Sequence, residues 1–189
     1  MSKTSKKKIS KKSPSKKKLP QDWPKSAGAR EILWRPDRFS YLSDKKKPEC
    51  VFCDALKKGL SVESLVVGMT DLSMIIMNKY PYNNGHLLVL PKRHVADVLD
   101  VTEEEYLDIN RLLRKTVAAL RKCYSSPPAG FNLGLNLGSV AGAGIPSHLH
   151  YHVIPRWLGD SNFFPLVAQT KVISETLEQT YKRLLPYLE

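Results

Sequence analysis

The sequence lacks long apolar runs, and it contains little cysteine. No uninterrupted apolar stretch reaches the roughly 20 residues of a membrane-spanning helix, so we expect no membrane span. No apolar segment of leader-peptide length follows the N-terminal lysines either. Three cysteines in 189 residues are too few for a disulfide-rich scaffold, which predicts a reducing, cytoplasmic environment.

Two common catalytic patterns are also missing. The glycine-rich stretch over residues 138–146 has no Gly-Lys-Ser/Thr ending, which excludes a P-loop. No serine, histidine and acid follow one another in an order typical of acyl transfer. Internal repeats are absent as well, so the chemistry must be sought in other motifs.

Acidic residues are absent from the first 20 positions, which contain nine lysines. These lysines account for nine of the net charge of +12, so the rest of the chain carries only +3. The Lys, Ser and Pro composition predicts a disordered tail over residues 1–30 and a folded domain over residues 31–189. The tail is either a solvated appendage, a site of weak attachment to nucleic acid or another polyanion, or, in a cell with a nucleus, a nuclear import signal.

The pattern of apolar residues predicts five strands and two helices. Strands are expected over residues 62–68, 72–78, 86–91 and 131–137, and in the stretch 147–157. Thr102 and Glu105 match a capping box that begins a long amphipathic helix over about 103–124. A shorter helix is expected over residues 173–185, with Ser174 as its candidate cap. The predicted class is α+β, with a five-stranded antiparallel sheet, one long helix and a shorter C-terminal helix.

Three of the five histidines occupy alternate positions in one stretch, as His148, His150 and His152. Because side chains alternate across a strand, the three imidazoles are expected on one face, about 6.5 Å apart. A purely structural role is disfavoured, since each buried imidazole would need hydrogen-bond partners. Imidazole titrates near neutrality, binds metals and can attack phosphorus, so the stretch is the candidate catalytic centre.

Cys50 and Cys53 form a C-x-x-C pair in what we expect to be a short loop over residues 48–54. Such a pair with two distant histidines makes a tetrahedral zinc site. His94 and His148 are the best histidine partners. Three glycines within seven residues directly precede the histidine stretch, and glycine lets backbone N–H groups approach a phosphate closely.

The histidine stretch resembles the signature of the histidine triad (HIT) superfamily, H-x-H-x-H followed by two apolar residues. The match is His148–Ile154. Further similar segments are Cys50–Cys53, Gly85–His94, Gly130–Gly138 and Pro155–Trp157. The resemblance covers about residues 31–185 and is greatest to the diadenosine tetraphosphate phosphorylase (ATP adenylyltransferase) group, which implies a HIT-like fold.

The resemblance also implies roles for individual residues. His150 would be the nucleophile that takes an adenylyl group, with His152 and His86 assisting at the phosphates. Structural zinc would be bound by Cys50, Cys53, His94 and His148. The implied substrate-binding residues are Asn78, Asn136, Gly142, Ala143, Gly144 and Trp157. Asn78 stands where many members carry an acidic ribose ligand, so it would bind the hydroxyls as a neutral group.

The expected function is a nucleotidyl transferase or phosphorylase that cleaves adenine dinucleoside polyphosphates through a histidine–AMP intermediate. Phosphate as second acceptor would yield ADP, and water would yield AMP. The resemblance further implies a homodimer. The alternatives are a HIT hydrolase of nucleoside diphosphates or phosphoramidates, a nucleotide-binding regulatory module, and a zinc-stabilised protein whose histidines are all structural. The complete triad favours an enzyme, because a pure binder needs no nucleophile.

Overall fold

The computed structural model describes residues 50–160 and 173–188. The predicted tail over residues 1–30 and the predicted start of the domain at residue 31 lie outside the described residues. Within the two described ranges, no helix combines the length and the apolar character that crossing a bilayer requires.

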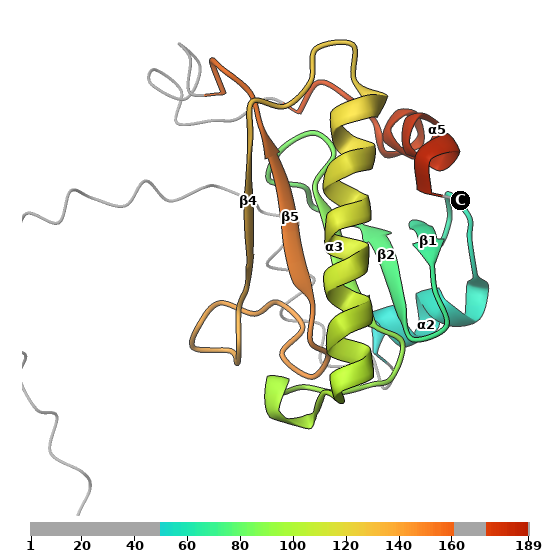
Figure 1. Cartoon of the computed structure of the whole chain (residues 1–189), viewed down its shortest axis with the longest axis vertical. Coiled ribbons are helices and arrows are strands. Elements are labelled where there is room, and N and C mark those ends of the chain that lie inside the picture. Colours follow the sequence, from blue (N-terminus) through green and yellow to red (C-terminus); the bar gives the residue numbers. More distant parts are fainter. Residues whose placement is uncertain (1–49, 161–172, 189) are drawn as a thin grey trace, which may run out of the picture. The chain divides into compact units, whose positions relative to one another are not determined.

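Five strands and three α-helices make up this part of the chain (Figure 1). In chain order they are α2 (Val51–Lys58), β1 (Val66–Met69), β2 (Ser73–Met77), β3 (Leu87–Pro91), the 3₁₀ turn η1 (Val98–Asp100), α3 (Glu103–Cys123), β4 (Gly130–Leu135), β5 (Tyr151–Arg156) and α5 (Leu177–Leu188). The strands lie in the order β1-β2-β3-β5-β4, and every neighbouring pair is antiparallel. The predicted α+β class and five-stranded antiparallel sheet are confirmed.

The long helix α3 begins at the predicted capping box. The Thr102 hydroxyl accepts a hydrogen bond from the Glu105 N–H at 3.2 Å, and the Glu105 carboxylate accepts one from the Thr102 N–H at 3.0 Å. Both bonds satisfy donors that the first turn of a helix leaves open. The apolar side of α3 then packs on the sheet through Ile109, Leu112 and Leu120.

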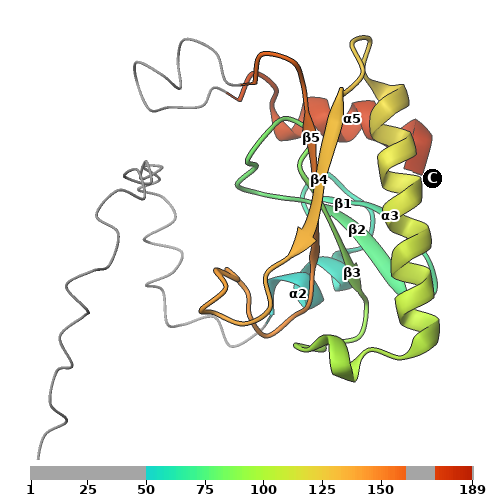
Figure 2. The same ribbon diagram turned by 60° about the vertical axis from the view of Figure 1, so that its left-hand side comes forward.

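Two separate apolar clusters lie on the two faces of the sheet, because residues alternate between faces along each strand. Val67, Ile75 and Val89 belong to the cluster with α3 and α5. Their neighbours along the strands, among them Ile76 and Leu88, belong to the cluster with α2. Figure 2 shows α3 and α2 on opposite sides of the sheet. The face that α2 covers only in part is the one that carries the histidines.

The segment that contains the two cysteines is helical, so the prediction of a short loop over residues 48–54 is wrong from Val51 onward. Cys50 is the N-cap of α2 and Cys53 lies in its first turn. The helix forms because Phe52 and Ala55 pack on the sheet, and it ends at Gly59, whose φ of 69° suits glycine. The C-x-x-C motif spans only four residues, and its spacing fits a metal-binding loop as well as the start of a helix.

The C-terminal helix begins later than predicted, at Leu177 instead of residue 173. Its cap is Thr176, whose hydroxyl accepts a hydrogen bond from the Gln179 N–H at 3.2 Å, while the Gln179 side chain accepts one from the Thr176 N–H at 2.8 Å. Ser174 is not the cap, because its hydroxyl accepts a hydrogen bond from the Asn84 amide at 2.8 Å.

Candidate functional site

The three histidines of the triad lie on the face of the sheet that α2 covers. Strand β5 begins at Tyr151, so only His152 is in the strand, and the prediction of a strand through all three is wrong at its start. The alternation nevertheless persists. The His150 and His152 ring centroids are 5.2 Å apart, and the Phe52 ring lies 5.5 Å from His148 and 5.2 Å from His150.

His150 is held in the form that a nucleophile requires. Its Nδ1 lies 2.8 Å from the backbone oxygen of His148. A carbonyl oxygen can only accept, so Nδ1 carries the hydrogen and Nε2 keeps a lone pair. Burial lowers the pKa of His150 from its ordinary value, which favours the neutral ring near pH 7. His150 therefore presents an uncharged, oriented imidazole.

His152 is held in the opposite tautomer by His86. The Tyr82 N–H donates to Nδ1 of His86 at 3.0 Å, so Nε2 of His86 carries the hydrogen. Nε2 of His86 is 2.9 Å from Nδ1 of His152, which must accept this hydrogen bond. His152 then carries its own hydrogen on Nε2. The two triad histidines thus present one lone pair and one N–H.

His86 itself is buried and does not line the cavity beside the triad. Its side chain also lies next to Asn78, whose Nδ2 is 3.3 Å from Nδ1 of His86. The Asn78 side-chain oxygen accepts a hydrogen bond from the Tyr80 N–H at 2.9 Å. The structure therefore places His86 behind His152. It places Asn78 among the residues that line the cavity, at the start of the loop that leads to His86.

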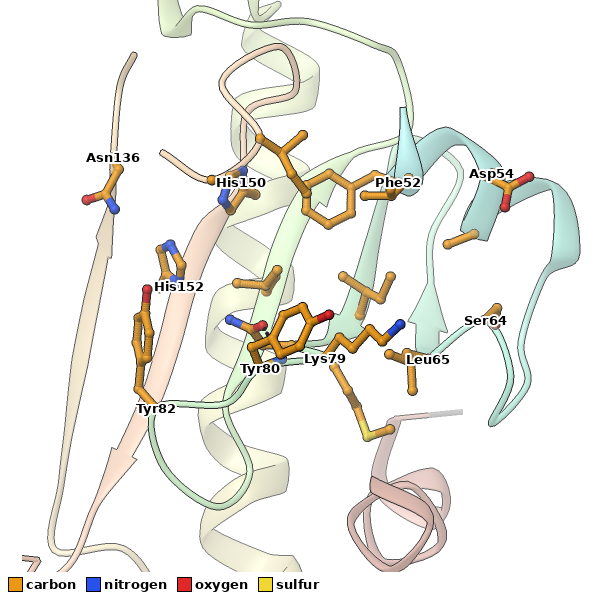
Figure 3. A pocket seen from close by; sticks show the side chains of 18 of the residues that line it. Phe52, Asp54, Ser64, Leu65, Lys79, Tyr80, Tyr82, Asn136, His150 and His152 are labelled. Carbon is orange, nitrogen blue, oxygen red and sulfur yellow. Dashed lines mark hydrogen bonds between the residues drawn. The ribbon is translucent and has the colours of Figure 1, made fainter. Parts of the chain in front are cut away.

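A cavity of about 370 Å³ opens beside the triad. One part of its wall is apolar, and the residues of that part are Phe52, Leu65, Ile76, Leu88 and Ile145. His150, His152, Asn136 and Tyr82 gather at the other end (Figure 3). A flat apolar base fits the first part, and an anion that needs hydrogen-bond donors fits the second.

The glycine loop reaches the cavity through Gly142 and Gly144, whereas Ala143 is not among its lining residues. Gly142 has a φ of 92°, which glycine adopts readily, and a Cβ there would lie 3.7 Å from the Asn136 amide nitrogen. Two backbone donors of the loop are already used within it. The Gly142 N–H donates to Ser139 at 3.0 Å and the Ala143 N–H to Gly138 at 3.3 Å.

The structure does not bring Trp157 to this cavity. Its indole N–H donates to the Ser126 oxygen at 2.8 Å, and its ring meets Tyr124 edge-on at 5.2 Å. Two residues that the sequence reasoning missed do line the cavity, namely Tyr80 and Tyr82. The signal that could have found them is the Tyr-Pro-Tyr sequence directly before His86.

The four predicted metal ligands come together although they lie far apart in the chain. The ligand atoms of Cys50, Cys53, His94 and His148 all lie within 4.8 Å of one another. Sγ of Cys50 is 3.4 Å from Nδ1 of His148, and Sγ of Cys53 is 3.3 Å from Nδ1 of His94. Tetrahedral zinc with usual bond lengths would separate sulfur and nitrogen by about 3.5 Å. The set fits this ion.

Two further observations support that fit. Nε2 of His148 lies 2.9 Å from the Pro91 oxygen, to which it donates, so Nδ1 directs its lone pair at the sulfurs. Burial, and then the adjacent Cys50, raise the pKa of the Cys53 thiol. A cation is therefore needed before both sulfurs can be thiolates side by side.

A bidentate ion pair fixes the segment that carries His94. Arg93 donates to both carboxylate oxygens of Glu105, from Nε at 2.8 Å and from a terminal nitrogen at 2.7 Å. The hydrogen bond from Arg93 holds the pKa of the Glu105 carboxyl below its ordinary value. Since Glu105 also closes the capping box of α3, the end of β3 is tied to the start of that helix.

Comparison with known proteins gives a family match and several relatives. The HIT domain model matches residues 60–157. An AP-4-A phosphorylase from Mycobacterium tuberculosis is 38% identical over 161 residues, which is 81% of each chain. An adenosine 5'-monophosphoramidase from Schizosaccharomyces pombe is 31% identical over 57% of this chain and 74% of its own.

Solved structures agree with these matches. A zinc-bound histidine triad family protein from Mycobacterium smegmatis superposes with a TM-score of 0.60 at 25% identity, over 74% of this chain and 93% of its own. A hypothetical histidine triad nucleotide-binding protein from Sulfolobus tokodaii superposes with a TM-score of 0.58 at 26% identity, over 74% of this chain and 91% of its own. The predicted HIT-like fold is confirmed.

Proposed function

Because the chain belongs to the HIT domain family, we propose that it is a nucleotidyl transferase that cleaves dinucleoside polyphosphates through a histidine–AMP intermediate. The observation that carries the proposal is the pair of tautomers at His150 and His152. One ring presents a lone pair and the other an N–H to the same cavity. The similarity to an AP-4-A phosphorylase supports diadenosine tetraphosphate as the substrate and phosphate as the second acceptor.

In the first step, Nε2 of His150 attacks the phosphorus nearest one adenosine. A P–N bond forms while the bond from that phosphorus to the bridging oxygen breaks, and ATP leaves. The N–H of His152 donates to the oxygen on which negative charge develops, and the Asn136 amide donates beside it. Since His86 holds the His152 ring in place before the reaction, little reorganisation of this donor is needed.

In the second step, an oxygen of inorganic phosphate attacks the phosphorus of the histidine–AMP intermediate. The P–N bond breaks, its electron pair returns to Nε2 of His150, and ADP is released. Water in place of phosphate gives AMP. The hydrogen bond from Nδ1 of His150 to the His148 oxygen stabilises the positive charge that the ring acquires when Nε2 is substituted.

The adenosine of the reacting half would occupy the apolar part of the cavity. Its base would pack on Phe52 and Leu65, which lie on opposite walls. Asn78 would bind the ribose hydroxyls, because its side-chain oxygen has a second lone pair besides the one that the Tyr80 N–H occupies. Asn78 lines the cavity, which supports this role.

Zinc at the four ligands would serve the fold instead of the reaction. Bound there, it would supply a tetrahedral cross-link among α2, the segment after β3 and the residues before β5. The backbone oxygen of His148 orients the His150 ring, and His148 is also one of the four predicted zinc ligands. Bound zinc would therefore also restrict the position of the His150 nucleophile.

A homodimer is part of the proposal. Among the strands in the described residues, β4 lies at an edge of the sheet, and an open edge with apolar side chains must be covered to avoid aggregation. Leu133 on β4 is exposed, as are Tyr106 and Leu107 on α3. A second copy placed edge to edge would cover these groups. Light scattering at micromolar concentration should give twice the chain mass, and a monomer mass would contradict the dimer.

Product analysis tests the proposed function most directly. Purified protein incubated with diadenosine tetraphosphate should form ATP and ADP with phosphate present, and ATP and AMP without it. His150→Asn should abolish turnover yet preserve the fold, because the asparagine amide can still donate to the His148 oxygen. Turnover within tenfold of the parent, roughly 1.4 kcal/mol in activation free energy, would exclude a nucleophilic role.

A hydrolase of phosphoramidates or nucleoside diphosphates is the second candidate, because an adenosine 5'-monophosphoramidase is among the relatives. The chemistry at His150 would be the same, with water as the only acceptor. Adenosine phosphoramidate offered in competition with diadenosine tetraphosphate distinguishes the two. A larger kcat/KM for the phosphoramidate, with no effect of inorganic phosphate, would favour the hydrolase.

A further inference from the structure

Tyr82 stands at the end of the cavity where the phosphate groups would lie. Its ring stacks near His152, with centroids 6.0 Å apart and an interplanar angle of 21°, and it lies 4.9 Å from His86. Figure 3 shows its hydroxyl directed toward His152 and Asn136, away from Phe52. The hydroxyl therefore points to the place of the polyphosphate chain and not to the place of the base.

The loop around Tyr82 is fixed on both sides. The Tyr82 N–H donates to His86, and the next residue, Asn83, donates from its buried amide to the Pro155 oxygen and to Asp160, both at 2.8 Å. Gly85 has a φ of 67°, and a Cβ there would meet the Tyr124 hydroxyl at 2.9 Å. The Tyr82 side chain is thus positioned before any ligand arrives, which lowers the entropic cost of binding.

In the part of the chain that the structure describes, few other donors lie at the phosphate end of the cavity. Two of the loop N–H groups beside it already donate within the glycine loop. Among the described lining residues the cations are Lys58 and Lys79. Lys58 is 3.2 Å from Glu63, and Figure 3 shows Lys79 near Leu65, away from His150 and His152. Within the described residues, an anion at the triad would therefore be bound by neutral donors, and loss of any one of them should weaken its binding.

We infer that the Tyr82 hydroxyl is a hydrogen-bond donor to the polyphosphate leaving group and to the inorganic phosphate that replaces it. The inference rests on the proposed nucleotidyl transfer and adds a residue that selects phosphate over water as the acceptor. Water needs no such donor, because it carries no charge to be neutralised. Phosphate, in contrast, loses hydration when it enters and requires charge-assisted hydrogen bonds in return.

The same contact serves both steps. In the first, Tyr82 donates to a phosphoryl oxygen of the departing ATP while the P–O bond breaks and the P–N bond to His150 forms. In the second, phosphate occupies the vacated place, one of its oxygens accepts from Tyr82, and another attacks the phosphorus. The P–N bond breaks and ADP forms. Tyr82 keeps its proton throughout, so no further acid or base is needed.

Tyr82→Phe tests this assignment because it removes one oxygen and keeps the ring that stacks on His152. Tyr187→Phe is the matched control, since Tyr187 is exposed on α5, away from the cavity. The parent and both variants are assayed on diadenosine tetraphosphate over a phosphate series, with ATP, ADP and AMP quantified. Melting curves establish that both variants fold.

In Tyr82→Phe we expect the KM for phosphate to rise by about 10- to 100-fold, as for loss of a hydrogen bond to a charged group. The ratio of ADP to AMP at fixed phosphate should fall in proportion. The rate of AMP formation from the intermediate by water should stay within a few-fold, which separates a lost phosphate contact from general damage. Tyr187→Phe should match the parent in all three measurements.

A phosphate KM and an ADP to AMP ratio within twofold of the parent would overturn the inference and leave nucleotidyl transfer intact. A parent that forms ATP and AMP regardless of phosphate would also overturn it, because no phosphate acceptor would then exist. A parent that forms no ATP from diadenosine tetraphosphate would overturn the proposed function first. The three outcomes are read from the same product analysis.

Discussion

Replacing His86 should separate its contribution to stability from its effect on the tautomer of His152. His86→Leu fills similar volume but removes both ring nitrogens. The Tyr82 N–H then loses its acceptor, and Nδ1 of His152 loses its donor. His86→Gln restores a side-chain N–H near the former Nε2, so it keeps a donor for His152 while the Tyr82 N–H still lacks an acceptor.

The expected magnitudes follow from these two hydrogen bonds. His86 is 2% exposed, so the orphaned Tyr82 N–H should cost about 1–3 kcal/mol of unfolding free energy in both variants. Loss of the donor to His152 frees its tautomer and its ring orientation. Loss of the partner that orients a metal-bound imidazole typically reduces activity about 10- to 100-fold, and we expect a loss of similar size here. His86→Leu should show that loss, and His86→Gln should recover most of it.

The assay pairs the initial rate of ATP formation from diadenosine tetraphosphate with calorimetric melting of the same samples. Both variants should melt at similarly reduced temperatures, whereas their rates should differ by about tenfold or more. Equal rates in the two variants would refute the assignment of His86 as the residue that fixes the His152 tautomer. A rate for His86→Leu within twofold of the parent would refute it as well.

Three further predictions concern the metal, the ion pair and the tail. Purified protein should contain about one zinc per chain, and chelation or Cys50→Ser should remove several kcal/mol of stability; absence of metal by elemental analysis, with unchanged melting after chelation, would contradict this. Glu105→Gln should cost about 1–2 kcal/mol near pH 7, because Gln keeps the capping box but loses the charge paired with Arg93. Since that pairing lowers the pKa of Glu105 from its ordinary 4.5, its stabilisation is present above pH 4.5 and disappears as the pH falls through the lowered value. Glu104→Gln, exposed in the same turn, is the control, and an equal loss in both variants at pH 7 would refute the role of the pair. Deleting residues 1–25 should preserve turnover and abolish salt-sensitive binding to DNA or RNA. If the intact protein binds neither DNA nor RNA at low salt, the tail does not bind polyanions.

The elements that the sequence predicted well are those with a strong local signal. Thr102 and Glu105 determine the start of α3 through two side-chain hydrogen bonds, and both residues are visible in the sequence. The strand pattern is equally local, because β2 and β3 are buried along their whole length and are apolar apart from Ser73. Prediction of these strands therefore required only the apolar runs and the turn residues between them.

The errors lie where distant contacts override local preference. Cys50 and Cys53 read as a loop because the packing of Phe52 on the sheet is not encoded in four residues of spacing. The strand of the histidine stretch starts late because the Leu149 N–H pairs with the Val95 oxygen at 2.7 Å, outside the sheet ladder. Neither partner can be identified from the neighbouring sequence.

Sequence spacing also did not assign positions within the candidate site. Asn136, Gly142 and Gly144 reach the cavity, but His86 lies behind His152, and Trp157 packs elsewhere. Whether a residue touches a ligand or supports a neighbour depends on burial and direction, which motifs do not specify.

The placement of β5 between β3 and β4 has a consequence for how activity is gained during folding. β1, β2 and β3 pair through short connections, so their hairpins can form early. His86 and His152 are 66 positions apart in the chain, and Cys50 and His148 are 98 apart. Closing such long loops costs more conformational entropy than closing the hairpins. This cost is offset only when β5 inserts between β3 and β4 and forms its contacts there. The contact between His86 and His152 and the cluster of predicted metal ligands therefore assemble in the same late event, and a partly folded chain with its hairpins complete has neither. Recovery of turnover on refolding should lag behind the recovery of helix and sheet signals, and zinc supplied during refolding should shorten that lag.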